Sequence, residues 1–222
     1  MLKHRSTCRT AALLGLALFI AAPARGADQP AKQASPIRVA IMPIINGSAE
    51  LSATKIMEDI IHERMKTVPT DRVHFLQPTD TERILISRNA IDRAERLNDR
   101  FSKYGTLDST AVDGLDSLLQ SDAILFVKVA EWENVRVNIV GKGESNTTVG
   151  FEFALFDLKS LKKTWAKTPR EQRFAQEVDP SSGAVQYDET GYIQSRGVTD
   201  PPRYEDVASD LIRSAFKKFP DK

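Results

Sequence analysis

Few side chains of this sequence could do acid–base or metal chemistry. His62 and His74 are the histidines that follow residue 24, and Glu131 and Glu133 flank Trp132. Two carboxylates on one strand face can act as an acid and a base, whereas a zinc site needs three or four converging ligands. Neither histidine belongs to a paired spacing such as HExxH. We therefore expect no catalytic residue, no cofactor and no metal.

The glycine-rich residues 141–145, GKGES, do not fit a phosphate-binding loop. Such a loop needs the spacing GxxxxGK[ST] and must open a helix, whereas these residues lie between two expected strands. They predict a hairpin turn instead. The alternation of side chains along a strand places Trp132 opposite its two flanking glutamates, so we expect the indole in the core and the carboxylates in solvent.

The first residues have the pattern of an export signal. Lys3, Arg5 and Arg9 precede the apolar residues 11–22, and small residues follow. We expect residues 1–24 to be a cleaved signal peptide, with cleavage after Ala24 or Gly26, and a periplasmic location. A membrane anchor is the alternative, but the apolar run spans only about 18 Å as a helix, against a hydrocarbon core of about 30 Å.

Charge and cysteine content limit the class of protein further. Cys8 is the only cysteine and precedes the apolar run, where it cannot be the lipid-bearing cysteine of a lipoprotein signal. Loss of residues 1–24 takes the formal net charge from +1 to −2, because Lys3, Arg5 and Arg9 are removed. A near-neutral chain lacks the basic footprint of a nucleic-acid-binding protein. Membrane contact is expected to be indirect unless the signal is uncleaved.

Hydrophobic periodicity predicts one domain over residues 37–219, preceded by a disordered spacer at 25–36. A buried strand over 37–45 precedes an amphipathic helix over 51–68, a short strand over 73–76 and a long helix. Thr79 and Glu82 fit a capping box at the start of that helix, with Ile86 and Phe101 on its apolar stripe and Gly105 at its end.

The second half of the domain predicts hairpins. A helix over 109–120 leads into an apolar strand at 123–127, and alternating strands follow at 135–139, 149–155 and 163–167. A last helix covers 204–219. Because helices come early and hairpins late, we expect an α/β fold: a single-domain sandwich with a mixed β-sheet that ends in an antiparallel meander and is packed by helices.

The polar residues 170–202 show no clear period and predict a long loop. Tyr187, Tyr192 and Tyr204 lie in this loop or just beyond it. Tyrosine offers a large contact area with one polar group, which suits protein interfaces. These three tyrosines are therefore the candidate partner-binding residues, with a plain flexible insertion as the alternative.

Residues 119–165 carry a resemblance to a known family. Asp122-Ala123, the apolar strand that follows, Trp132, Asp157-Leu158 and Trp165 match a pattern of bacterial cell-envelope lipoproteins of unassigned activity. That family is similar in fold to the periplasmic part of CsgG, to LpoB and to the amino-terminal domain of TolB. The chain departs from it by lacking the lipidated cysteine, and by having Leu161 where the family's turn has glycine.

The resemblance implies a non-enzymatic periplasmic envelope protein that acts as a protein–protein interaction or assembly domain. Its partner would be another envelope protein or a second copy of the chain, bound through a sheet edge or through the tyrosine-bearing loop. The alternative is a small periplasmic hydrolase or ligand-binding protein. That alternative requires His62, His74, Glu131 and Glu133 to converge in one pocket.

Overall fold

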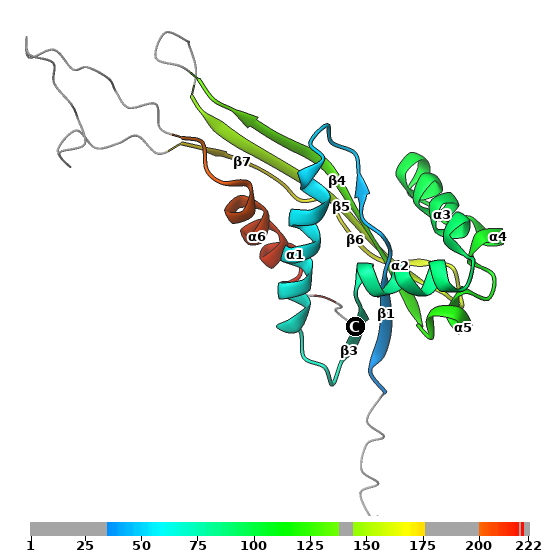
Figure 1. Ribbon diagram of the computed structural model, residues 1–222. Helices are drawn as coiled ribbons and strands as arrows, with labels where there is room; N and C mark the ends of the chain where they lie inside the picture. Colours follow the sequence, from blue (N-terminus) through cyan, green and yellow to red (C-terminus); the bar gives the residue numbers. More distant parts are fainter. Residues whose placement is uncertain (1–34, 138–143, 176–199, 218, 220–222) are drawn as a thin grey trace, which may run out of the picture. The chain divides into compact units, whose positions relative to one another are not determined.

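Strands at the centre of the fold form one mixed sheet, as the sequence predicts (Figure 1). The computed structural model describes residues 35–137, 144–175, 200–217 and 219. These belong to one compact unit that begins at Ser35. The expected signal peptide, the spacer as far as residue 34, the 141–143 turn, Tyr187 and Tyr192 lie outside the described residues.

The sheet has a parallel half and an antiparallel half. The strands are β1 (Ile37–Ile41), β2 (Ile45–Asn46), β3 (Val73–Leu76), β4 (Ala123–Val135), β5 (Asn146–Asp157), β6 (Lys163–Lys167) and β7 (Arg170–Phe174). Their order is β3-β1-β4-β5-β6, with β2 beside β4 and β7 beside β5. β3, β1 and β2 run parallel to their neighbours, and β4 to β7 pair antiparallel.

Helices cover both faces of the sheet. α1 (Ser52–Lys66) and α6 (Tyr204–Ala215) pack on one face. α2 (Pro78–Ser87), α3 (Ile91–Tyr104), α4 (Ser109–Val112) and α5 (Leu115–Leu119) pack on the other. The sheet therefore separates two apolar clusters.

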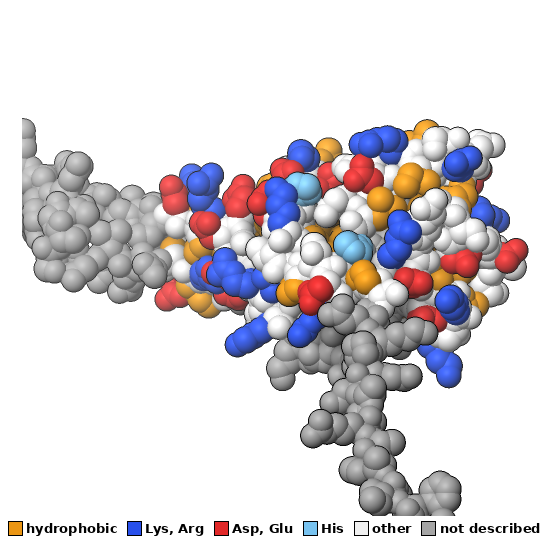
Figure 2. Space-filling view, turned by 90° about the horizontal axis from the view of Figure 1, so that it is seen from below, with side chains coloured by type: hydrophobic (Ala, Val, Ile, Leu, Met, Phe, Trp, Pro, Cys, Tyr) orange, Lys and Arg blue, Asp and Glu red, His pale blue; other side chains and the backbone are white. Residues whose placement is uncertain are grey.

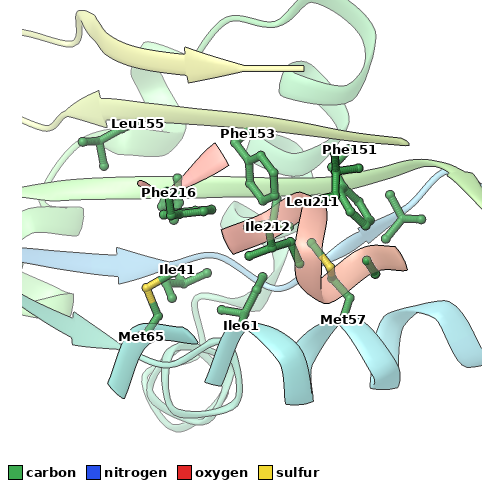
Figure 3. Close-up of a cluster of buried hydrophobic side chains, with 14 of the residues drawn as sticks. Ile41, Met57, Ile61, Met65, Phe151, Phe153, Leu155, Leu211, Ile212 and Phe216 are labelled. Atoms are coloured by element: carbon green, nitrogen blue, oxygen red, sulfur yellow. The ribbon is translucent and has the colours of Figure 1, made fainter. Parts of the chain in front are cut away.

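Strand β5 fills the first cluster by strict alternation. Val149, Phe151, Phe153 and Leu155 share one face, as the sequence predicts, and all lie in the cluster with α1 and α6. Figure 3 shows Phe151, Phe153 and Leu155 in this cluster. On the opposite face, Phe126 stacks on Phe101 with ring centroids 4.7 Å apart. Burial of these large side chains is the main favourable term that holds the layers together.

The predicted long helix over residues 79–104 is wrong. The helix breaks at Arg88–Ala90, where Asn89 has a left-handed φ of 54°, and Ile86 is 58% exposed rather than core. The capping box is also wrong, because Gln77 is the N-cap and Pro78 the first helical residue. The predicted stop is confirmed: Gly105 adopts a φ of 64°, which glycine allows without steric cost.

Other predicted boundaries shift for local reasons. The 109–120 helix divides into α4 and α5 at Gly114, and Asp108 caps α4 by accepting from the N–H groups of Thr110 and Ala111. The strand over 37–45 divides into β1 and β2. The strands predicted at 123–127 and from 135 are one long strand, β4, with an irregular register between Val129 and Glu131.

The predicted loop over residues 170–202 begins as strand β7. Its sequence, Arg-Glu-Gln-Arg-Phe, has a single apolar residue, so hydrophobic periodicity does not predict a strand here. Pairing with β5 nevertheless satisfies one side of its backbone from Arg170 to Phe174. Tertiary pairing thus outweighs the polar composition of the segment.

Candidate interaction surface

The four residues singled out for chemistry do not converge. His62 on α1 and His74 on β3 are both exposed. His74 pairs with Arg38, whose N–H donates to Asp122. From Asp122 to Glu131 the strand spans about 30 Å at roughly 3.3 Å per residue. His74 therefore lies far from Glu131. Within the described residues, no group of three or more His, Cys, Asp or Glu side chains could hold a metal ion.

A Ser-x-x-Lys spacing, Ser52 to Lys55, was missed by the sequence reasoning. Such a lysine acts as a base only when its pKa is lowered. Here Lys55 donates to Asp59 at 2.6 Å, and this hydrogen bond raises the lysine pKa. The Ser52 hydroxyl donates to the Glu50 carboxylate at 2.8 Å. Both groups are held by neighbouring carboxylates, so the pair is a helix-start arrangement rather than a nucleophile and base.

A small hollow lies where β1 and β4 begin. Its volume is about 330 Å³, and its lining includes Arg38, Gln120, Asp122 and Lys159. The Asp122 carboxylate is occupied by the Arg38 N–H at 3.0 Å. In Figure 2, which views the molecule from below, basic and acidic side chains are interspersed and do not gather into a patch of one sign.

The helices α2–α5 cover only part of their face of the sheet. Their cover ends at the ion pair of Lys128 on β4 with Glu152 on β5, which joins Nζ and Oε1 at 3.0 Å. Lys128 Nζ also reaches the carbonyl of Ser102 on α3. Beyond this pair β4, β5 and β7 continue to the upper left in Figure 1, away from α2–α5. None of the described helices covers the sheet face there.

We call this bare region the open sheet face. It consists of cross-strand rows from β4, β5 and β7: Glu131–Gly150–Arg170, Glu133–Thr148–Gln172 and Val135–Asn146–Phe174. Cross-strand partners share a face, so each row presents its three side chains together.

Because β5 has small or short side chains here, the side chains of β4 and β7 can approach each other across it. Glu131 accepts from Arg170 Nε at 2.9 Å across Gly150. Gln172 donates to Asn146 Oδ1 at 3.1 Å. At the far end, Phe174 is 47% exposed. The open sheet face is thus polar along most of its length, with apolar side chains at its tip.

The strands β6 and β7 form one margin of the sheet, and β3 forms the other. Phe151 N–H donates to the Pro169 carbonyl at 2.9 Å, and Ala175 N–H donates to the Ser145 carbonyl at 2.8 Å. Successive residues of a strand direct their backbone groups to opposite sides. The alternate residues therefore point theirs away from β5; they are Ala166, Thr168, Arg170, Gln172 and Phe174.

We call the side of the sheet that these residues present the outer edge. No strand of the described part of the chain pairs there. Pro169 lacks an N–H, but Pro169 is an inward residue, so the loss falls on the ladder to β5 and leaves the outer edge intact. The residues whose backbones face outward are all exposed. Within the described residues, the sheet thus ends in a continuous row of donors and acceptors to which no other strand is bonded.

The ring of Tyr204 takes part in the packing of the fold. It is half-buried at the start of α6, and it stacks on Trp132 with ring centroids 4.8 Å apart and planes 13° apart. Burial raises its pKa, and the charges of Glu50 and Glu133 add to that rise. Trp132 is 4% exposed, as predicted for a core residue. Tyr204 therefore anchors α6 to β4, and only its remaining surface is open to a partner.

Comparisons with known proteins do not decide the family. No family model matches the sequence, and no curated protein matches it. Among solved structures, lipoprotein GNA1162 from Neisseria meningitidis is 16% identical at a TM-score of 0.47, covering 66% of this chain and 90% of that chain. At this score the likeness leaves the resemblance of residues 119–165 a prediction.

Two further structures have lower scores. A PelC dodecamer from Paraburkholderia phytofirmans is 16% identical at a TM-score of 0.42, covering 83% of this chain and 88% of that one. The LpoB C-terminal domain from Salmonella enterica is 8% identical at 0.34, covering 65% and 89%. No helix among the described residues is long and apolar enough to cross a membrane.

Proposed function

We propose that this chain is a non-enzymatic envelope protein of the bacterial periplasm that acts as an interaction or assembly domain. One observation carries the proposal: the outer edge and the open sheet face adjoin each other and are both uncovered by the described residues. An unpaired edge is a ready template for another strand, and a bare sheet face beside it enlarges the surface that one partner can contact.

The pattern of the first residues supports a periplasmic location. Residues 1–24 would direct export and be removed, which leaves a chain without cysteine that contacts the membrane only through partners. The mass of the exported protein tests this directly. A mass that still includes residues 1–24 would refute the soluble form and favour an anchored one.

The likeness in kind to CsgG, LpoB and TolB modules belongs to this proposal and rests on residues 119–165. Tyr187, Tyr192 and the open side of Tyr204 remain a second candidate contact. A hydrolase is not proposed, because His74 lies at the far end of the sheet from the glutamates of β4, and His62 is on α1, which packs on the opposite face of the sheet from them.

Site-specific photocrosslinking in living cells tests the interaction. A photoreactive residue at Gln172 on the outer edge should give a crosslink to an envelope protein or to a second copy of the chain. The same residue at Glu63, an exposed position on α1, is the matched control and should give none. Positions 187 and 192 form a separate arm. The absence of a crosslink at Gln172, or equal crosslinking at Glu63, would refute binding through the edge.

A further inference from the structure

The outer edge has features that select its partner. Alternate backbones point outward without interruption from Ala166 to Phe174, a length of about 26 Å at roughly 3.3 Å per residue. Proline at an edge normally blocks strand addition by removing a donor. The N–H that Pro169 lacks would have pointed inward, toward β5. An incoming strand therefore meets a full set of outward N–H and carbonyl groups on either side of Pro169.

The edge also carries lysines without ion-pair partners among the described residues. Residues 163–174 contain Lys163, Lys167, Arg170 and Arg173 against the single acid Glu171. Both arginines are already paired: Arg170 with Glu131 at 2.9 Å, and Arg173 with Glu171 at 2.6 Å and Asp210 of α6 at 3.2 Å. Hydrogen bonding to Glu171 raises the pKa of Arg173. Lys163 and Lys167 are exposed, and neither has an ion-pair partner among the described residues.

This charge argues against a second copy as the added strand. A second copy would have to add its own outer edge as an antiparallel strand. Pairing about Arg170 sets Arg170 opposite itself and Lys167 opposite Arg173. Like charges directly opposite each other destabilise a strand pair. Pairing about Pro169 or Gln172 would set Glu171 opposite Lys167 or Arg173, but Glu171 is already bound by Arg173 of its own strand. The two lysines without ion-pair partners, Lys163 and Lys167, therefore favour an acidic strand over a second copy.

We propose that the outer edge binds an extended acidic segment of a partner protein as an additional β-strand. This inference rests on the proposed interaction function and names the chemistry of the partner. One face of the added strand would meet Arg170 and Gln172 beside the open sheet face, with an apolar residue near Phe174. The other face would meet Lys167. An acidic side chain near Lys167 would set the register.

Peptides test the backbone requirement and the charge requirement separately. The probes are a synthetic peptide of alternating Glu and Val and its counterpart of alternating Lys and Val, titrated against the full mature protein and followed by amide NMR shifts and hydrogen exchange. The acidic peptide should protect the outward amides, those of Ala166, Thr168, Arg170, Gln172 and Phe174. The basic peptide should leave them unprotected.

Two variant pairs sharpen the test. Gln172→Pro removes one outward N–H and should weaken binding of the acidic peptide about tenfold, whereas Gln172→Ala keeps the N–H and should bind as the wild type does. Lys163→Glu with Lys167→Glu should exchange the preference toward the basic peptide. Thermal melting confirms that each variant is folded.

The outcomes separate this inference from the proposed function. Equal binding of both peptides, or equal binding by the Pro and Ala variants, would overturn the acidic-strand inference. If crosslinking at Gln172 captures a partner while the acidic peptide protects no edge amide, the interaction function stands and strand addition is refuted. If the peptide binds as described but Gln172 crosslinks nothing in cells, the edge chemistry stands and the proposed function is refuted.

Discussion

Thr147 should be a strong point of attachment for the chain that enters α6. Its side chain is fully buried on β5. The hydroxyl accepts from Asn134 Nδ2 at 3.0 Å and donates to the carbonyl of Pro202, which lies just before Tyr204. Thr147→Val keeps the shape of the side chain but removes both hydrogen bonds.

The expected cost follows from those two bonds. A typical hydrogen bond contributes about 0.5–1.5 kcal/mol net, and an abandoned buried partner adds to the loss. Asn134 is exposed and can turn to water, whereas the Pro202 carbonyl is half-buried and less free to do so. We therefore expect Thr147→Val to lower the free energy of unfolding by about 1–2 kcal/mol.

The assay is urea unfolding followed by tryptophan fluorescence, with Thr148→Val as the matched control. Thr148 is the next residue of the same strand and is 4% exposed, but its hydroxyl makes no hydrogen bond within the described residues. We expect the control to change stability by less than about 0.5 kcal/mol. Loosening of the Pro202 segment should also disturb the stack of Tyr204 on Trp132 and shift the emission. Equal effects of the two variants would refute the attachment.

Further predictions concern glycine, strain and charge. A Cβ at Gly47 would lie 2.8 Å from the Val129 carbonyl oxygen, so Gly47→Ala should separate β2 from β4 and cost about 1–3 kcal/mol in thermal or urea unfolding. Leu161 has a φ of 58°, so Leu161→Gly should relieve strain and leave stability unchanged or up to about 1 kcal/mol higher; a clear loss would show that its side chain packs. The Ser160 N–H lowers the pKa of Asp157, so this carboxylate stabilises the fold above the ordinary aspartate pKa. The stability difference between wild type and Asp157→Ala should shrink as pH falls through the lowered pKa, and a constant difference would contradict the assignment.

Local signals were sufficient wherever one force dominated. The alternation from Val149 to Leu155 predicted which face of β5 is buried, since a strand has only two faces. Gly105 predicted a helix end because a left-handed residue is required there. Trp132 could be assigned to the core from the polar residues on either side of it. These features depend on a few neighbouring residues.

The candidate surface was harder to predict. β7 is polar, and its strand conformation comes from pairing with β5 and from contact between Arg173 and α6. The break at Asn89 has neither glycine nor proline to signal it. Tyr204 was predicted to contact a partner. Its stack on Trp132 shows how its ring packs within the fold and does not test that prediction.

The sequence by itself determined the α/β class, the apolar face of β5 and the core position of Trp132, because these follow from periodicity and from the cost of burying polar groups. It also predicted an export signal, which the described residues do not include. Only the tertiary structure decided which strands form the edges of the sheet, since that depends on which strands pair across long separations in the chain. The inward position of Pro169, which leaves the outer edge unbroken, is a consequence of register, and register is set between strands rather than within one.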